Sequence, residues 1–385
     1  MTDIRRKKIS IFGVTGSIGK SAVDLVRTYP DKFEIYGLTA HQNCTELAQL
    51  IAEFSPKYAV ISNPQSYAEL SQLCREADTN LLTGADALVE LATHQVDLLI
   101  AGIVGLAGMN SVYAAIQSGQ TIALANKETL VAAGHLMMAE LQKSEARILP
   151  IDSEHNAIYQ CLASESSSDI KTITLTASGG PFRDLRPSEL HQVTLESALA
   201  HPNWEMGPKV TIDSATMMNK GLELIEAYWL FGLKPEQIKA VIHPQSAIHG
   251  LVEFCDGSWL AHMGIADMRV PISHALGFPE RLAWPTESLD LISLGQLDFK
   301  KIDTALYPCF ASAYSVIGTN PANAVILNAA NEVAVDWFLA GKITFIEISR
   351  LVDRALESNI NRAMLNCLDD VIALDRETRI FLSAE

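Results

Sequence analysis

Apolar runs that alternate with helical patterns fill the first 150 residues, and they constrain the fold more than any other feature. Strand-like runs are expected at residues 8–13, 33–40, 58–62, 96–105, 121–128 and 146–152, with helices at 17–29, 47–54 and 87–94. This order needs crossover connections, so it predicts an α/β fold with a doubly wound, Rossmann-like parallel sheet. Ligands of such sheets bind beyond the carboxyl ends of the strands.

The pattern changes near residue 152. Further strands are expected at 170–180, 209–213, 239–243 and 248–254, and a helix is expected at 217–231. We therefore predict a dinucleotide-binding domain at 1–151 and a central α/β catalytic domain at 152–277, with a lid near 198–208. A linker at 278–308 and a C-terminal helical bundle at 309–385 complete the expected organisation.

The glycine-rich stretch "IFGVTGSIGKS" permits two interpretations. Its Gly-Lys-Ser end resembles a P-loop, but that motif needs a glycine at position 14, where this chain has Val14. Glycines at 13, 16 and 19 instead follow a strand and open a helix. This context favours a dinucleotide-binding turn, with the pyrophosphate at the helix N-terminus.

The end of the second predicted strand bears on the choice of dinucleotide. NAD sites usually place a carboxylate there for the ribose hydroxyls. This chain has the uncharged sequence Thr39-Ala40-His41-Gln42-Asn43. The absence of a carboxylate favours NADP, with neutral side chains and backbone amides as expected partners of the 2′-phosphate.

Composition excludes several classes of function. The net charge of −16 argues against a nucleic-acid surface. The longest apolar run, Leu98 to Met109, is too short to span a bilayer. Six cysteines form no Cys-x-x-Cys pair, so we expect reduced thiols and a cytoplasmic location.

Two carboxylates stand close together in "LPIDSEHNAI". Asp152 and Glu154 follow an apolar run, and side chains two residues apart share one face of an extended segment. They are suited to a hard divalent cation. The alternative is a helix N-terminus, where Asp and Ser act as caps and Glu favours the helix dipole.

A second candidate group lies in "DSATMMNKGLELIEAYWLF". Asn219, Lys220 and Glu223 share one face of the predicted helix. They could offer an amide, an ammonium and a carboxylate to a small anion and its metal, or they could form a solvated helix face. The flanking "TASGGPFR" has small residues suited to phosphate, and "HPNWEMGPK" places His201 and Trp204 on a loop suited to a lid.

Together these blocks resemble the 1-deoxy-D-xylulose 5-phosphate reductoisomerases of the non-mevalonate isoprenoid pathway. The resemblance covers nearly the whole chain and rests on "TGSIG", "LANKE", "LPIDSEHNAI", "SGGPFR", "HPNWEMG", "DSATMMNKGLE", "HPQSAIHG" and "DMRVPI". It implies metal ligands at Asp152, Glu154 and Glu223, and a substrate site of Ser153, Glu154, Ser178, His201, Ser214, Asn219, Lys220 and Glu223.

The resemblance also implies a flexible lid that includes Trp204 and Met206. The implied NADPH contacts are Thr15, Gly16, Ser17, Ile18, Asn126, Glu128 and Gly207, and we add Gln42, Asn43 and Lys127 to the predicted cofactor site. The implied cation is Mg²⁺, Mn²⁺ or Co²⁺, and the implied assembly is a homodimer. The implied reaction is a metal-assisted rearrangement of a sugar phosphate followed by hydride transfer.

Two departures from the family pattern concern the cofactor site. Val14 stands where Ser or Ala is common, and Gln42 stands where a basic residue is common. Two other functions stay open from the residues alone, a P-loop kinase acting on a small metabolite and an NADP-sensing regulator. ATP hydrolysis would identify the first, and the group of Asp152, Glu154, Lys220 and Glu223 argues against the second.

Overall fold

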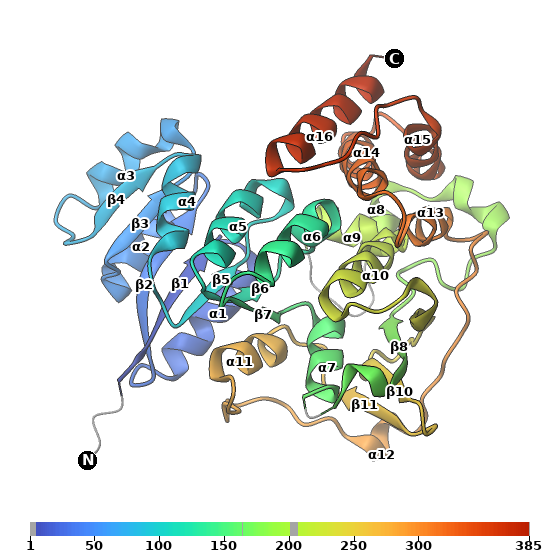
Figure 1. Cartoon of the computed structure of the whole chain (residues 1–385), viewed down its shortest axis with the longest axis horizontal. Coiled ribbons are helices and arrows are strands. Elements are labelled where there is room, and N and C mark those ends of the chain that lie inside the picture. The colour runs from blue at the N-terminus through green and yellow to red at the C-terminus, as the bar shows by residue number, and fades with distance from the viewer. Residues whose placement is uncertain (1–4, 164, 201–206, 385) are drawn as a thin grey trace. The chain divides into compact units, whose positions relative to one another are not determined.

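The computed structural model describes residues 5–163, 165–200 and 207–384 (Figure 1). The chain forms two compact units. The first comprises Met1–Thr129, Met137–Ser153 and Asp267–Thr286, and the second comprises Leu130–Leu136, Glu154–Ala266 and Glu287–Glu385.

A seven-stranded sheet forms the centre of the first unit, with the strand order β4-β3-β2-β1-β5-β6-β7. Every neighbouring pair is parallel. The strands are β1 (Lys7–Phe12), β2 (Phe33–Ala40), β3 (Tyr58–Ile61), β4 (Asn80–Thr83), β5 (Leu98–Ala101), β6 (Thr121–Leu124) and β7 (Arg147–Pro150). The strand order reverses direction between β1 and β5, and such a switch point is where ligands of open α/β sheets bind.

Helices connect these parallel strands. They are α1 (Ser17–Thr28), α2 (Cys44–Phe54), α3 (Tyr67–Leu73), α4 (Ala85–Thr93), α5 (Met109–Gln117) and α6 (Lys127–Leu141), while α11 (Arg269–Gly277) comes from a later part of the chain and packs against α1. Right-handed crossovers that leave β1 and β5 in opposite directions place their helices on opposite faces of the sheet. The central strands are therefore covered on both sides, and β3 and β5 are buried almost throughout, for example at Val60 and Ile100.

The prediction of a doubly wound α/β sheet is confirmed, with local differences such as the following. The short strand β4 was not predicted, because "NLLT" is only four residues long and is half exposed. The strand expected at 121–128 ends at Leu124. There the side chain of Asn126 accepts a hydrogen bond from Thr129 N at 3.3 Å and begins helix α6.

The second unit contains a mixed four-stranded sheet in the order β11-β10-β8-β9. Its strands are β8 (Ile170–Ala177), β9 (Ile238–Ile242), β10 (Ile248–Phe254) and β11 (Trp259–Met263). β8 pairs with β9 in parallel, and β10 runs antiparallel to both β8 and β11. β11 was not predicted from the sequence, because it lies at the edge and most of its side chains are exposed.

The second unit also contains helices. They are α7 (Ser153–Cys161), α8 (Leu195–Leu199), α9 (Pro208–Ala215), α10 (Met218–Phe231), α12 (Leu291–Leu294), α13 (Pro308–Val316), α14 (Pro321–Leu339), α15 (Phe345–Glu357) and α16 (Leu368–Ser383). The expected C-terminal helical region is confirmed, since α14 packs against both α15 and α16. Among the described helices, none is both long enough and apolar enough to cross a membrane.

One predicted strand is wrong. Residues 209–213, "KVTID", belong to helix α9. Gly207 is its N-cap and Pro208 takes the first turn, where a missing amide hydrogen does no harm. The buried residues Thr211, Ile212 and Ala215 follow helical spacing. The β-branched residues suggested a strand, but the cap and the burial pattern favour the helix.

Candidate active site

Each glycine of the glycine-rich turn has a distinct structural role. Gly13 has φ +80°, and a Cβ there would lie 2.8 Å from Gly102 O. A Cβ on Gly19 would lie 2.4 Å from Val14 Cα, so this glycine lets α1 pack closely on the turn. Gly16 is exposed and is the N-cap of α1 without a side-chain cap. The backbone of this turn is therefore open to an anion at the helix N-terminus.

The end of β2 holds the turn in place. Gly13 N donates to Thr39 Oγ1 at 2.9 Å, and Val14 N donates to Thr39 O at 2.8 Å. The following residues begin α2, where Asn43 Oδ1 accepts from Glu46 N at 3.2 Å. Gln42 is exposed beside this cap. The structure thus brings the predicted residues of both loops to the same edge of the sheet.

The "LANKE" stretch begins at the carboxyl end of β6 and leads into α6. Asn126 caps α6 and donates to Gly105 O at 2.8 Å, which ties it to the loop after β5. Lys127 Nζ lies 2.5 Å from Asp152 Oδ2 in an ion pair with little solvent exposure. Glu128 is buried. These predicted cofactor residues therefore gather at the switch-point side of the sheet.

In the second unit, Lys220 connects two helices that carry acidic residues. Its Nζ lies 2.8 Å from Glu154 Oε1 on α7 and also bonds Glu223 Oε2 on its own helix α10. Asn219 Nδ2 donates to Glu223 Oε1. The exposed fractions are 4% for Lys220 and 1% for Glu223. The alternative of a solvated helix face is therefore wrong, because both charged side chains are buried. Their burial is tolerated because they are paired with each other.

Asp152 leads directly into α7, whose first turn contains Glu154. The boundary between the two units falls within this turn, between Ser153 and Glu154. One oxygen from each of Asp152, Glu154 and Glu223 lies within 4.8 Å of the others. The helix-terminus alternative describes the location of these carboxylates correctly, but it does not exclude a metal. Three hard oxygen donors are a fitting set for a divalent cation.

Two serines of the predicted substrate site, Ser178 and Ser214, lie in segments that pack together. Ser178 Oγ accepts from Gly180 N at 3.2 Å in the turn after β8. Gly180 has φ +63°, and a Cβ there would lie 2.8 Å from Ser214 O. Tyr307, the N-cap of α13, donates from its OH to Gly179 O at 2.7 Å and so anchors this turn. The "SGG" turn thus packs directly on the end of α9.

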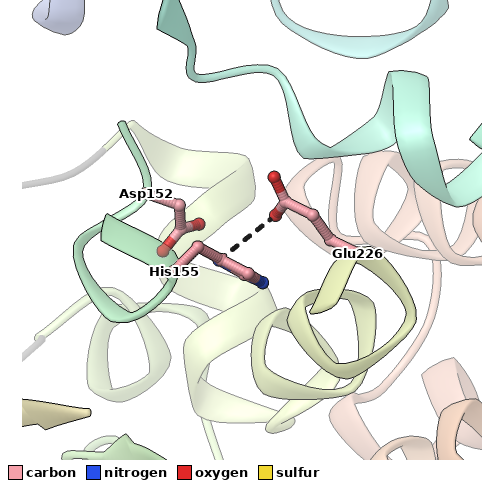
Figure 2. Close-up of side chains that lie close together, drawn as sticks. All are labelled: Asp152, His155 and Glu226. Atoms are coloured by element: carbon pink, nitrogen blue, oxygen red, sulfur yellow. Dashed lines mark ion pairs between the residues drawn. The ribbon is translucent and has the colours of Figure 1, made fainter. Parts of the chain in front are cut away.

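A buried pair beside these carboxylates was not predicted from the sequence. His155 Nε2 bonds Glu223 O at 2.8 Å, and His155 Nδ1 lies 3.4 Å from Glu226 Oε2. Figure 2 shows the His155 ring pointing toward the Glu226 carboxylate. Both side chains are essentially inaccessible to solvent. The available signal was the recurrence of Glu223 and Glu226, three residues apart on a largely apolar helix. Asp152, His155 and Glu226 form a second group with possible ligand atoms within 4.8 Å.

His249 on β10 is another buried histidine near this site, at 6% exposure. Burial is the main cause that lowers its pKa, and the positive charge of Lys220 lowers it further. Hydrogen bonds with the backbone of Ile265 and Gly264 act in the opposite direction. The neutral imidazole is therefore favoured next to the Lys220 ammonium.

The remaining predicted residues are distributed as follows. Ser153 is the first residue of α7, and Gly207 is the exposed N-cap of α9. Thr15, Ser17 and Ile18 lie in the glycine-rich turn and the first turn of α1. His201, Trp204 and Met206 lie outside the described residues.

Sequence models of one family match most of the chain. The model described as 1-deoxy-D-xylulose 5-phosphate reductoisomerase matches residues 9–134. Two models of the family's C-terminal domains match residues 148–231 and 263–381.

Full-length relatives agree with these matches. The chain is 48% identical to the 1-deoxy-D-xylulose 5-phosphate reductoisomerase of Tolumonas auensis, covering 97% of this chain and 96% of the relative. It is 49% identical to the enzyme of the same name from Stutzerimonas stutzeri, covering 97% and 96%.

Solved structures agree as well. The reductoisomerase of Zymomonas mobilis in complex with NADPH is similar with a TM-score of 0.93 and 42% identity, covering 99% of both chains. A reductoisomerase in complex with NADPH, fosmidomycin and magnesium also has a TM-score of 0.93, with 42% identity over 98% of both chains. This chain therefore belongs to the 1-deoxy-D-xylulose 5-phosphate reductoisomerase family.

Proposed function

We propose that the protein converts 1-deoxy-D-xylulose 5-phosphate and NADPH to 2-C-methyl-D-erythritol 4-phosphate and NADP⁺, in the non-mevalonate isoprenoid pathway. It acts as a metal-dependent oxidoreductase and isomerase. The observation that carries this proposal is the buried group in which Lys220 joins Glu154 to Glu223. Membership of the family supplies the reaction.

NADPH is assigned to the switch-point edge of the parallel sheet. The exposed N-cap Gly16 and the uncapped start of α1 fit a pyrophosphate. The solved Zymomonas mobilis relative holds NADPH. The residues proposed to hold the cofactor are Thr15, Gly16, Ser17, Ile18, Gln42, Asn43, Asn126, Lys127, Glu128 and Gly207. The bound nicotinamide would supply the hydride.

A divalent cation, Mg²⁺, Mn²⁺ or Co²⁺, is assigned to Asp152, Glu154 and Glu223. Their oxygens fit a hard cation, and the ammonium groups of Lys127 and Lys220 offset only part of the negative charge. When bound, the cation would polarise the oxygens of the substrate. Solved relatives of the family hold magnesium.

The chain's own side chains orient the substrate. Asn219 and Lys220 present an amide and an ammonium from the first turn of α10, beside the Glu223 carboxylate. The Ser178–Gly180 turn packs on Ser214 and is suited to the phosphate group. Ser153 and His201 complete the proposed set, and Trp204 and Met206 are proposed for the lid. Binding energy from the phosphate would hold the reacting carbons in position.

We also propose a domain assignment and a cytoplasmic location. Residues 1–151 bind the dinucleotide, 152–277 bind metal and substrate, 278–308 link, and 309–385 form the helical domain. The protein's proposed partner is a small-molecule sugar-phosphate substrate, and we propose no nucleic-acid or membrane partner.

A homodimer is proposed through one face of the mixed sheet. Trp259 on β11 is 51% exposed, and it lines an apolar groove together with Phe299 and Tyr314, which are also exposed. A contiguous exposed apolar patch is typical of a protein interface. Sedimentation of the wild type and of Trp259→Glu tests this: a dimer that becomes monomeric supports the face, and a dimer that persists in the variant rejects it.

Oxidation of NADPH in the presence of 1-deoxy-D-xylulose 5-phosphate tests the function. Turnover should require a divalent cation, be lost on chelation, and return with Mg²⁺, Mn²⁺ or Co²⁺. ATP hydrolysis without NADPH oxidation would instead support the P-loop kinase. Binding of NADPH without turnover under any cation would support the sensor.

A further inference from the structure

The residues at the end of β2 include no lysine or arginine to bind the 2′-phosphate of the proposed cofactor. A phosphate monoester carries about −1.5 to −2 charges near neutral pH and is bound best by a charged donor. The residues that follow β2 are His41, Gln42 and Asn43, and none is a lysine or arginine. His41 Nδ1 is already 2.9 Å from Ser62 Oγ. A lysine or arginine for the 2′-phosphate would therefore have to come from another element.

Lys20 on α1 reaches this turn. It lies one helical turn beyond Gly16, and its Nζ is 3.2 Å from Glu46 Oε1 in the first turn of α2. Glu46 Oε2 in turn accepts from Asn43 Nδ2 at 2.8 Å. The helix that begins at the proposed pyrophosphate site thus places the Lys20 ammonium beside the turn after β2. The ribose of the dinucleotide is expected at this turn.

The ion pair that holds Lys20 is easily exchanged. The side chains of Lys20 and Glu46 are 57% and 27% exposed, and exposed pairs contribute little to stability. The other basic side chain on α1, Arg27, is held at the opposite end of the helix by two 2.7 Å bonds to Glu53. Among the described residues of α1, Lys20 is therefore the cation available at this turn.

We propose that Lys20 is the residue that selects NADPH over NADH, by exchanging Glu46 for the 2′-phosphate of the cofactor. This inference rests on the proposed function, because it assumes a reduced nicotinamide dinucleotide in this site. It also gives a role to the lysine of the Gly-Lys-Ser sequence, which is not part of a complete P-loop motif because residue 14 is valine. In this chain a residue of α1 would replace the basic side chain that is missing at Gln42.

Equilibrium binding tests the proposal without any turnover. Kd for NADPH and for NADH is measured from the fluorescence of the reduced nicotinamide, for the wild type, Lys20→Gln, Lys20→Arg and Glu46→Gln. Lys143→Gln is the matched control, because Lys143 makes an exposed ion pair with Glu140 at 3.3 Å. Loss of one charged contact should weaken NADPH binding by about tenfold in Lys20→Gln, with NADH binding unchanged.

The other variants sharpen the result. Lys20→Arg should keep the preference, and Glu46→Gln should strengthen NADPH binding because the competing carboxylate is gone. An unchanged ratio of the two Kd values in Lys20→Gln overturns the proposal, as does an equal loss for both dinucleotides. If the wild type binds neither dinucleotide, the proposed function itself fails. A wild type that prefers NADPH, with an unaltered preference in Lys20→Gln, rejects only the role of Lys20.

Discussion

Lys220 Nζ lies 2.8 Å from Glu154 Oε1 and ties α10 to α7 through a side chain that is 4% exposed. Lys220→Met removes this cation and leaves Glu154 and Glu223 facing one another. Breaking a buried ion pair costs about 3–5 kcal/mol, so we expect a marked fall in thermal stability. Divalent cations should restore much of it, because a ligand of the folded state raises the free energy of unfolding.

Thermal unfolding with and without Mg²⁺ measures this effect. Lys171→Met is the control, since Lys171 pairs with Glu253 at the same 2.8 Å but is 58% exposed. Such an exposed pair contributes only about 0–1 kcal/mol. Equal stability losses in the two variants, or no response of Lys220→Met to Mg²⁺, would contradict the assignment of the carboxylates to a cation.

Glu223→Gln keeps the shape of the side chain but removes one proposed metal ligand. We expect metal-dependent turnover to be almost lost, because a neutral amide is a poor substitute for a carboxylate toward a hard cation. NADPH binding should stay within about twofold, since the variant leaves the parallel sheet untouched. Steady-state kinetics and fluorescence titration measure the two effects. Glu253→Gln serves as the control, and near-normal turnover in Glu223→Gln would refute the ligand assignment.

Much of the first unit could be predicted from sequence, because each strand other than β4 contains a short apolar run next to a turn. The strand that ends at Phe12 and the glycines that follow it are adjacent in the sequence. The strand and its turn can therefore be recognised from a short stretch of residues. The same holds for the acidic pair Asp152 and Glu154, which stand close together in the chain.

Long-range partners could not be predicted, since they depend on which helices pack together. The pairing of His155 with Glu226 joins two helices that are far apart in the sequence. Helix α9 was mistaken for a strand because its β-branched residues outweighed the Gly207-Pro208 start. The exposed strand β11 lacks the apolar alternation that identifies buried strands.

The buried carboxylate of Asp213 makes a further prediction possible. Asn331 Nδ2 on α14 donates to Asp213 Oδ1 at 2.7 Å, and Lys209 Nζ lies 2.9 Å from Asp213 Oδ2. Asn331→Ala would remove the donor in a fully buried site and should lower the free energy of unfolding by about 2–3 kcal/mol. Urea denaturation measures this. Combining it with Asp213→Asn should give less than the sum of the single losses, and full additivity would show that the two residues are not coupled.

The pH dependence of stability should depend on His274 in α11. Burial, followed by the charge of Arg281, lowers its pKa from 6.5 to about 4. The unfolded chain therefore binds a proton between pH 6.5 and 4 that the folded chain does not. Stability is full above pH 6.5 and falls as the pH drops through this window. His274→Gln should lose less stability between pH 7 and pH 4.5 than the wild type, as measured by urea denaturation. His191→Gln, at an exposed site, should keep the wild-type slope, and a wild-type slope in His274→Gln would contradict the prediction.

Two glycines of the glycine-rich turn should differ in what they affect. Substitution of Gly19 should lower stability, and substitution of Gly16 should weaken dinucleotide binding. A Cβ on Gly19 would lie 2.4 Å from Val14 Cα, so Gly19→Ala must push α1 away from the turn. A Cβ on Gly16 comes no nearer than 3.3 Å to Gly13 O, and Gly16 is exposed at the proposed pyrophosphate site. Gly19→Ala should therefore lower the melting temperature by several degrees, since overpacking costs about 1–3 kcal/mol.

Gly16→Ala should instead keep the melting temperature within about one degree, because a small steric adjustment costs only tenths of a kcal/mol. Its methyl group would nevertheless stand where the pyrophosphate must approach the backbone, so NADPH and NADH should both bind at least about tenfold more weakly. This equal loss differs from the NADPH-specific loss expected for Lys20→Gln. Differential scanning fluorimetry and dinucleotide titration of the two alanine variants test the pair. Unaltered binding in Gly16→Ala would place the pyrophosphate away from the start of α1.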